Sequence, residues 1–367
     1  MQRPVVVDGV ELVVPEPGRN LPPTAFTSPA VFEMEQKSVF ARSWVHVADL
    51  ADLPGLGSYV AAQIGRTPVI VVRDRHTGEL RAFLNACRHR GAQLLEGSGT
   101  CEKQIKCPYH AWSYGTDGKL LAVPYPQEFG DVSRMGLIPV RVGTCGPLVF
   151  ACLDATAPSL EEWTGTLSSA LAGTEGWQLA FEKRYELAAN WKLFVENAND
   201  GYHIQFVHDI LTDLLAPDSG ETTLEAHSAY SHANINPAYV PPEMDPAGAK
   251  IRFGHIFPNF VPVKSPTDIT YIRVDPIAHD RLALFVRSYD DNQFPHLREL
   301  RKLAFERTTD QDLAVVLRTQ RGLYAHGLPA GVHAATFEER IGHFERMWAE
   351  AIGSEPAPKR HLALAAT

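Results

Sequence analysis

The sequence lacks any run of eighteen apolar residues, so it predicts no helix that crosses a membrane. Its first twenty residues, MQRPVVVDGVELVVPEPGRN, contain acidic residues and prolines and lack the charged-then-apolar layout of a signal peptide. A G-x-G-x-x-G segment is also absent, so we expect this chain not to take hydride from a nicotinamide cofactor itself.

Positive charge is scarce and nowhere clustered. The chain has 34 Lys and Arg residues against 43 Asp and Glu residues, a net charge of -9 and a pI near 5.9. Because the phosphates of a nucleic acid need clustered Lys and Arg, this balance argues against a nucleic-acid partner. The length of 367 residues allows two domains.

Two pairs of Cys and His residues carry the strongest chemical signal. Cys87 and His89 form a C-x-H pair, Cys107 and His110 form a C-x-x-H pair, and seventeen residues separate the pairs. Two thiolates and two imidazoles from two loops are the ligand set of a Rieske [2Fe–2S] cluster, in which two Cys hold one iron and two His hold the other.

A structural zinc site is the alternative, since two Cys and two His also suit tetrahedral zinc. Zinc pairs usually have two or more residues between their members because both chelate one ion, whereas the first pair here has a single intervening residue. Gly91 and Pro108 stand where tight ligand loops need them. The spacing favours the iron–sulfur cluster.

The segment CRHRG…CPYHAW resembles the Rieske domain of the oxygenase component (alpha subunit) of Rieske non-heme iron oxygenases. In that family a Gly-Trp follows the second pair. Ala111 replaces the glycine here, a change expected only to adjust the loop. Respiratory-type Rieske proteins carry an extra disulfide-bonded Cys in each loop, but Ala92 and Tyr109 occupy those positions. The resemblance is therefore to the oxygenase and ferredoxin branch.

Three cysteines remain outside the cluster pattern, an odd number that suggests no disulfide framework. We expect Cys145 and Cys152 to be buried as small apolar residues, and we assign no role to Cys101. Because thiolate ligands and an oxidisable cluster need reducing surroundings, we expect a cytoplasmic location.

The pattern predicts an N-terminal arm and helix over residues 1–39, an all-β Rieske domain over 40–154 and a catalytic domain over 155–367. The helix begins at Ser28, and the first cluster loop follows a hairpin that turns at Gly78. In the last domain, strands over 227–291 precede helices over 294–324 and 337–352, which indicates an α+β fold, and residues 357–367 read as a tail. The resemblance implies a helix-grip (START-like) domain with a curved antiparallel sheet around a long helix.

A second metal site is expected, because a Rieske cluster passes only single electrons and oxygen chemistry needs another centre. Asp200, His203 and His208 form a D-x-x-H-x-x-x-x-H arrangement. Two His and a carboxylate form the facial triad that leaves open positions on Fe(II). Residues five apart lie about 140° apart on a regular helix, so both imidazoles can reach one iron only across a π-bulge or a helix end. Gly201 makes such an irregularity easier.

The resemblance supplies the third iron ligand and the roles of several neighbours. Asp312 is the expected carboxylate ligand, with Asp310 as the competitor, and Gln311 stands where the family usually has Glu. Asp200 would hydrogen-bond His203 and, across a subunit boundary, His110 of a neighbouring copy.

Less specific roles are expected of four further residues. Asn197 would lie near the iron pocket, and Trp112 would pack over the cluster. Arg88 and Arg90 could serve ferredoxin docking or a subunit contact, or simply face solvent.

Taken with the resemblance, these patterns imply the terminal oxygenase of a multicomponent Rieske system, with a [2Fe–2S] cluster and a mononuclear Fe(II). Electrons would come from NAD(P)H through a separate reductase or ferredoxin, O2 would be a substrate, and the chain would form a homotrimer. The organic substrate would be an aromatic or related small molecule undergoing mono- or cis-dihydroxylation, or oxidative N- or O-demethylation. An electron carrier and a non-enzymatic ligand-binding protein are the rival classes.

The sequence leaves the substrate open. Five phenylalanines are candidates for an apolar pocket, although core packing is the commoner fate of such residues. They are Phe206, Phe253, Phe257, Phe260 and Phe285. Arg252 and Arg287 could meet a substrate carboxylate or face solvent.

Overall fold

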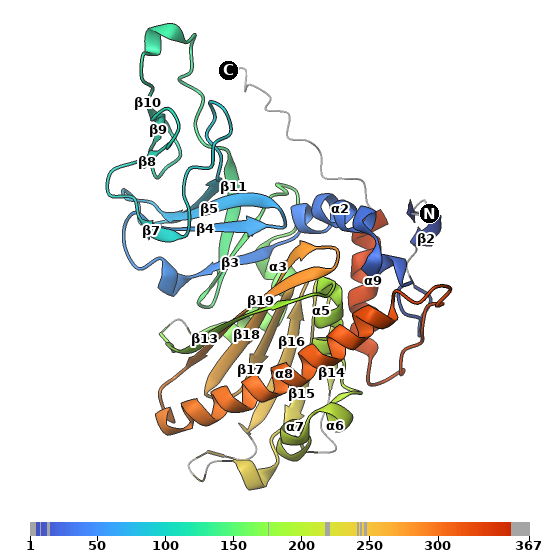
Figure 1. The fold of residues 1–367 in the computed structure, drawn as a ribbon. Coiled ribbons are helices and arrows are strands. Elements are labelled where there is room, and N and C mark those ends of the chain that lie inside the picture. The colour runs from blue at the N-terminus through green and yellow to red at the C-terminus, as the bar shows by residue number, and fades with distance from the viewer. Residues whose placement is uncertain are drawn as a thin grey trace.

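A computed structural model describes residues 5–7, 9–12, 15–174, 176–216, 221–240, 242, 244–245 and 248–353. The expected tail over 357–367 lies outside these residues. Figure 1 shows a β-rich upper part and a lower part in which helices cover one curved sheet. None of the described helices is both long and apolar enough to span a bilayer.

The N-terminal segment is a short hairpin followed by helices. Ser28 caps the main helix, because its Oγ accepts hydrogen bonds from the backbone N–H groups of Ala30 and Val31 at 3.2 and 3.4 Å. The predicted helix start is confirmed. The elements are β1 (Val5–Val7), β2 (Val10–Leu12), α1 (Thr24–Thr27), α2 (Pro29–Ser38) and the 3-10 turn η1 (Phe40–Arg42).

The upper part contains two antiparallel sheets. Described strands form a seven-stranded sheet in the order β3-β12-β11-β6-β5-β4-β7 and a three-stranded sheet in the order β10-β9-β8. The strands are β3 (Val45–Asp49), β4 (Ser58–Ile64), β5 (Thr67–Arg73), β6 (Leu80–Leu84), β7 (Ser98–Thr100), β8 (Ile105–Lys106), β9 (Ser113–Tyr114), β10 (Leu120–Ala122), β11 (Pro139–Cys145) and β12 (Leu148–Cys152), with the 3-10 turns η2 (Leu50–Asp52) and η3 (Pro126–Glu128).

This part contains the hairpin predicted to turn at Gly78 and a second hairpin at Gly118. β5 pairs antiparallel with β6, and Gly78 in the connection has φ +74°, a conformation that favours glycine. β9 pairs with β10 around Gly118, whose φ is +86°. Strands β3 to β12 fall within the range expected for the first domain, and the boundaries at 39 and 154 themselves stay a prediction.

The lower part is built on a second seven-stranded antiparallel sheet among the described residues, in the order β13-β19-β18-β17-β16-β15-β14. α5 packs on β16 to β19, α8 packs on β13, and α9 packs on β14 and β15, so the expected curved sheet with a covering helix layer is confirmed. The strands are β13 (Gln178–Leu187), β14 (Thr222–Leu224), β15 (Ser228–Asn234), β16 (Lys250–Ile256), β17 (Phe260–Lys264), β18 (Asp268–Ala278) and β19 (Arg281–Asp290).

The helices of this part include one that is broken at the predicted metal site. They are α3 (Leu160–Thr164), α4 (Leu167–Leu171), α5 (Trp191–Asn199), α6 (Ile204–Val207), α7 (Asp209–Leu214), α8 (Arg298–Gly322) and α9 (Glu339–Gly353), with the 3-10 turns η4 (Pro237–Tyr239) and η6 (Pro295–Leu297). α8 and α9 are the two long helices expected from the sequence.

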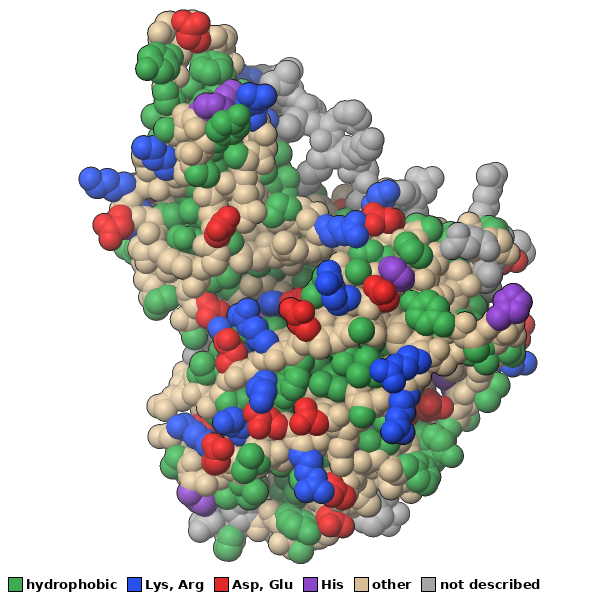
Figure 2. All heavy atoms as spheres, in the orientation of Figure 1, with side chains coloured by type: hydrophobic (Ala, Val, Ile, Leu, Met, Phe, Trp, Pro, Cys, Tyr) green, Lys and Arg blue, Asp and Glu red, His purple; other side chains and the backbone are tan. Residues whose placement is uncertain are grey.

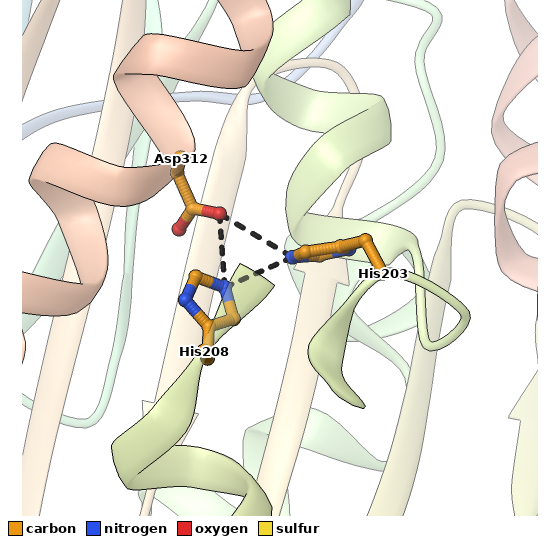
Figure 3. Close-up of side chains that lie close together, drawn as sticks. All are labelled: His203, His208 and Asp312. Atoms are coloured by element: carbon orange, nitrogen blue, oxygen red, sulfur yellow. Dashed lines mark hydrogen bonds and ion pairs between the residues drawn. The ribbon is translucent and has the colours of Figure 1, made fainter. Parts of the chain in front are cut away.

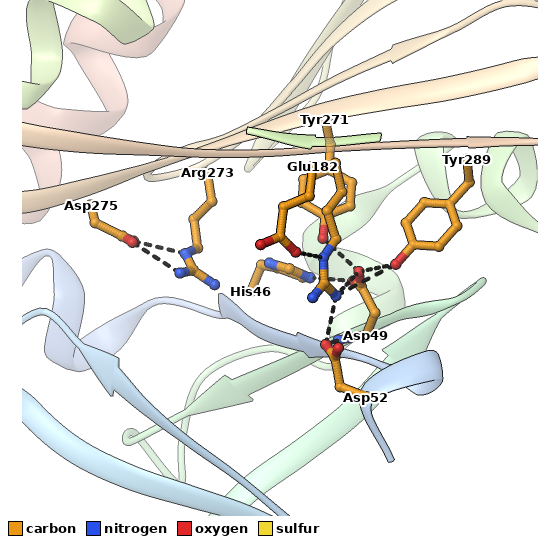
Figure 4. A network of polar contacts seen from close by, with 9 residues as sticks. His46, Asp49, Asp52, Glu182, Tyr271, Arg273, Asp275 and Tyr289 are labelled. Atoms are coloured by element: carbon orange, nitrogen blue, oxygen red, sulfur yellow. Dashed lines mark hydrogen bonds and ion pairs between the residues drawn. The ribbon is translucent and has the colours of Figure 1, made fainter. Parts of the chain in front are cut away.

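A buried carboxylate joins the two parts on the sheet face opposite α8. The side chain of Asp49, at the end of β3, has no exposed surface. It accepts hydrogen bonds from His46 Nε2 at 2.9 Å, Tyr271 Oη at 2.6 Å and Tyr289 Oη at 2.5 Å, as Figure 4 shows. Arg287 Nη1 also donates to it, at 2.7 Å. Burial alone would raise the pKa of Asp49, but the hydrogen bonds from His46, Tyr271 and Tyr289 hold it well below its usual range.

The same contacts explain why Arg287 and Phe285 are not available to contact a substrate. Arg287 also pairs with Asp52 at 2.7 Å and Glu182 at 2.8 Å, so its guanidinium is committed to this junction and does not await a substrate carboxylate. Phe285 lies under three arginine side chains, including that of Arg287 at 5.0 Å from the ring centre.

We predict that Asp49→Ala lowers the free energy of unfolding by about 3–5 kcal/mol, because it leaves buried donors of both parts without an acceptor. Urea unfolding followed by tryptophan fluorescence measures the change. Glu182→Ala is the matched control, because it removes a more exposed partner of Arg287 and should cost less than about 1 kcal/mol. Equal effects of the two substitutions would contradict the assigned importance of Asp49.

Candidate functional site

The two candidate metal-binding histidines flank a short helix that follows the end of α5. α5 ends at Asn199, and Asp200 has extended backbone at its C-cap. His203 and His208 then stand at the two ends of the single-turn helix α6. The prediction that two imidazoles five residues apart need a distortion is confirmed, and the distortion is a helix end.

Asp312 completes a triangle with these histidines. Its Oδ1 lies 3.3 Å from His203 Nε2 and 3.1 Å from His208 Nε2, and the two Nε2 atoms are 3.0 Å apart (Figure 3). Asp312 comes from α8, more than a hundred residues further along the chain. Asp310, the competitor, is an exposed residue of the same helix and is not part of this group.

The charges of the triangle are those of a cation site. Burial lowers the pKa of His203, but the carboxylates of Asp200 and Asp312 outweigh burial and raise it to about 9. Asp312 Oδ1 is buried, and no geometrically sound hydrogen bond reaches it. A metal ion at the centre would supply the positive charge that a protonated imidazole otherwise provides. Two imidazole nitrogens and one carboxylate oxygen fit a mononuclear Fe(II) site.

Asp200 and Asn197 both lie against His203. Asp200 Oδ2 is 3.1 Å from His203 Nδ1, and its Oδ1 accepts a hydrogen bond from the backbone N–H of Tyr202 at 2.6 Å. This arrangement holds the ring with Nε2 toward the triangle. Asn197 Nδ2 is 3.4 Å from that same Nε2. The roles of both residues in function stay predictions.

Gln311 is a site residue that the sequence interpretation treated only as a weakened match to the family pattern. Its Oε1 lies 3.0 Å from His208 Nδ1, on the ring atom that faces away from the triangle. Its position directly before Asp312 could have marked it as a site residue, because two neighbouring helix residues can contact two members of one site.

The second candidate site is formed by the loops between β6 and β9. Cys87 and Cys107 are buried and unbridged, whereas His110 is exposed and its ring centre lies 4.8 Å from that of His89. Two free thiols beneath two adjacent imidazoles near the surface fit the ligands of a Rieske cluster. Trp112 stacks on His89 at 5.1 Å and 6° between the ring planes, which agrees with the expected packing beside the cluster.

Ala111 does more than adjust the second loop. Its φ is +59°, the left-handed conformation that favours the glycine of the family pattern and costs other residues roughly 1 kcal/mol. Backbone hydrogen bonds hold the turn, from Ala111 N–H to Cys107 O at 3.1 Å and from Cys107 N–H to Trp112 O at 2.8 Å.

Tyr114 was missed at the sequence level, where no spacing marks it. Its hydroxyl lies 3.3 Å from Cys87 Sγ and accepts a hydrogen bond from the Arg88 backbone N–H at 3.0 Å. Burial and the Cys87 sulfur raise the pKa of Tyr114, so the hydroxyl stays protonated and can donate to the sulfur. Hydrogen bonds to cluster sulfurs tune reduction potential.

The arginines beside His89 have different environments. Arg88 Nη1 donates to the carbonyl of Gly136 at 2.9 Å, so this side chain supports the fold of the loop. Arg90 is exposed and lies over the ring of Tyr109 at 5.9 Å. Only Arg90 therefore remains as a candidate for a partner contact.

Most of the pocket candidates pack elsewhere. Phe257 and Phe260 are buried against Phe344 and His46 respectively. Phe206 is 70% exposed, and Arg252 lies over the ring of Tyr230 at 4.8 Å. Phe253 is half-buried on β16, and its carbonyl accepts a hydrogen bond from Arg340.

Comparison with known families places both sites in one architecture. Residues 43–141 match the Rieske [2Fe-2S] domain, and residues 174–354 match the ring hydroxylating alpha subunit (catalytic domain). Together these ranges cover about three quarters of the chain. The fold and the two sites thus define an iron–sulfur domain joined to a catalytic domain. The chain belongs to the Rieske oxygenase alpha-subunit family, and the expected cofactors are a Rieske cluster and a mononuclear iron.

Several curated proteins are similar to the chain. Glycine betaine monooxygenase oxygenase subunit of Chromohalobacter salexigens is 35% identical over 205 residues, covering 54% of this chain and 45% of that protein. Anthranilate 1,2-dioxygenase large subunit of Acinetobacter baylyi is 38% identical over 194 residues, covering 50% and 41%. These alignments span less than half of either relative. Choline monooxygenase of Spinacia oleracea is 27% identical over 349 residues, covering 90% and 78%.

Solved structures share the fold. The quaternary ammonium Rieske monooxygenase CntA superposes with a TM-score of 0.81 at 24% identity, covering 91% of this chain and 95% of that chain. Naphthalene 1,2-dioxygenase from a Rhodococcus species superposes with a TM-score of 0.73 at 22% identity, covering 91% and 94%.

We predict that Asp312→Ala abolishes iron binding at the triangle, whereas Asp310→Ala leaves it unchanged, because only Asp312 faces the two histidines. Metal analysis of purified protein should show one iron fewer per chain for Asp312→Ala, with the visible absorbance of the cluster unchanged. Loss of iron from the Asp310→Ala protein instead would mean that the wrong carboxylate had been assigned.

Proposed function

We propose that this chain is the terminal oxygenase of a multicomponent Rieske system, which inserts oxygen from O2 into a small organic substrate. The observation that carries the proposal is the convergence of His203, His208 and Asp312 in a chain that also holds a Rieske ligand set. Electrons come from NAD(P)H through a separate flavin reductase, a ferredoxin or both.

The chain's own residues divide the work. Cys87, His89, Cys107 and His110 hold the cluster, which supplies single electrons. His203, His208 and Asp312 hold the iron, which supplies oxygen activation when bound. Asp200 orients the His203 ring through Nδ1.

We further infer that the working unit is a homotrimer, in which Asp200 of one copy links to His110 of the next. Figure 1 supports this, because strands β8 to β10 lie at the top of the molecule and helices α6 and α7 at the bottom. The two candidate sites of one chain are therefore far apart, and a link between them would have to join two copies. Exposed aromatic side chains flank both sites: Tyr109 (58% exposed) beside His110, and Tyr202 (46% exposed) beside Asp200. Such residues are enriched in the cores of subunit contacts.

Figure 2 shows hydrophobic side chains exposed at this upper end, where a pocket is lined in part by the cluster ligands His89, Cys107 and His110. The pocket has a volume of about 750 Å³ and is lined by aromatic and proline side chains, among them Tyr109, Tyr125 and Phe129. A ferredoxin or reductase would approach the same exposed end, and the buried, unbridged thiols of Cys87 and Cys107 favour a reducing, cytoplasmic setting.

Two substrate classes are carried forward. Aromatic or related compounds undergoing mono- or cis-dihydroxylation are supported by similarity to anthranilate 1,2-dioxygenase. Oxidation or demethylation of a quaternary ammonium compound is supported by similarity to glycine betaine monooxygenase and choline monooxygenase.

Iron content and oxygen uptake test the proposed class. Native protein should contain about three irons per chain, two from the cluster and one from the triangle. His203→Ala should keep the cluster spectrum and lose product formation when the reduced protein meets O2 and substrate. Retained turnover in this variant would sink the assignment, and about two irons in native protein would favour an electron carrier or a ligand-binding protein.

The substrate experiment uses chemically reduced protein, so that no partner has to be identified first. Single-turnover mixtures with aromatic acids, aromatic hydrocarbons, glycine betaine and choline are analysed by mass spectrometry for one or two added oxygen atoms or a lost methyl group. The class that yields product in stoichiometric relation to cluster oxidation is the substrate class.

We predict that Asp200→Asn leaves both metals bound and slows cluster oxidation in a single turnover at least tenfold, because it removes the charge that couples the two sites. Stopped-flow absorbance follows the cluster. Asp213→Asn, an exposed aspartate of α7, is the matched control and should react at the native rate. A native rate for Asp200→Asn would rule out the proposed link between the sites.

A further inference from the structure

A chain of polar contacts runs from the surface to the back of His208. Arg307 forms an ion pair with Asp209, and the carboxylate of Asp209 also interacts with the side chain of Gln311. Gln311 Oε1 then lies 3.0 Å from His208 Nδ1. Arg307 and Asp209 are more than half exposed, whereas His208 is buried. The contacts thus connect a solvated ion pair to a metal-binding ring.

Elementary hydrogen-bond chemistry fixes the direction of every link. A guanidinium only donates, and an ionised carboxylate only accepts. Gln311 must therefore turn its amide NH2 toward Asp209, which leaves its carbonyl oxygen for His208. Because that oxygen only accepts, His208 must carry its proton on Nδ1.

A neutral imidazole has one N–H, so His208 Nε2 is left with a free lone pair. This atom is the one that lies 3.1 Å from Asp312 Oδ1 and 3.0 Å from His203 Nε2. The direction set at the surface by Arg307 thereby decides which ring atom of His208 is available to a metal.

We propose that Gln311 is a positioning residue that fixes the tautomer and ring orientation of His208, and that the Asp209–Arg307 pair fixes the orientation of Gln311. The inference rests on the proposed metal site formed by His203, His208 and Asp312.

The amide explains why a glutamine suits this position. A glutamate here would place a second carboxylate beside Asp209, with no donor between them, whereas the amide serves an acceptor on one side and a donor on the other. The two histidines are consequently supported differently: a carboxylate, Asp200, faces Nδ1 of His203, and a neutral amide faces Nδ1 of His208.

The test measures metal affinity, which is independent of turnover. Protein that lacks the mononuclear iron but keeps its cluster is titrated with Co2+ by calorimetry. Cluster absorbance and thermal melting show whether each variant is folded. Gln311→Leu should bind Co2+ at the triangle about 10–100-fold more weakly, the usual effect of losing such a supporting contact. Arg318→Gln, an exposed change on α8, is the control and should bind like the native protein.

Two more variants separate the hydrogen bond from simple packing. Gln311→Glu keeps an acceptor for His208 Nδ1 but adds a negative charge beside Asp209, so it should recover part of the affinity lost in Gln311→Leu. Asp209→Asn frees the amide to rotate, so it should weaken binding less than Gln311→Leu and add nothing in that background.

The proposal is overturned if Gln311→Leu binds Co2+ within twofold of native protein, or if Gln311→Glu binds as weakly as Gln311→Leu. If Gln311→Leu fails to fold, the Co2+ affinities of Gln311→Glu and Asp209→Asn are compared with that of the native protein. Both variants should bind more weakly, and native affinity in both would overturn the proposal. Failure of native protein to bind Co2+ at the triangle would instead remove the metal site and the proposed function with it.

Discussion

The desolvated carboxylate of Asp49 is the interaction on which the relative placement of the two domains depends. An ion without solvent must receive a full set of hydrogen bonds, and here three of the four donors come from the other side of the domain junction. Hydrogen bonds are directional, so this requirement selects one docking arrangement where apolar packing alone would tolerate several. Phe150 and Phe260 pack around the same point at 5.4 Å between ring centres.

Sequence reasoning succeeded where the chemistry is local. Cys87 and His89 lie on one loop, and their spacing suggested the cluster. The five-residue interval between His203 and His208 conflicts with helical geometry, and this spacing predicted the helix end. It failed where partners are distant. Asp49 and Tyr289 lie 240 residues apart, and nothing near either residue identifies the other. Phe260, Phe285 and Arg287 were pocket candidates for the same reason: residue type shows what a side chain can contact, not which sheet face it is on.

Two residues that depart from the quoted family motifs lie beside the candidate metal sites. Ala111 adopts a backbone conformation that suits glycine, and Gln311 offers an amide where the pattern has an acid. Hydrogen bonds hold each altered residue in place, within the Cys107–Trp112 turn for Ala111 and to His208 for Gln311. Strain and exchange of this kind gather at functional sites because the surrounding structure over-determines their geometry.

Asp49 lies at the base of the upper domain, so a small rotation of this domain at the junction would move its far end the most. The strands that carry His110 project away from the junction, as Figure 1 shows. Because the rate of electron transfer falls steeply with distance, the proposed transfer from the cluster would depend on how rigidly this distant junction holds the upper domain.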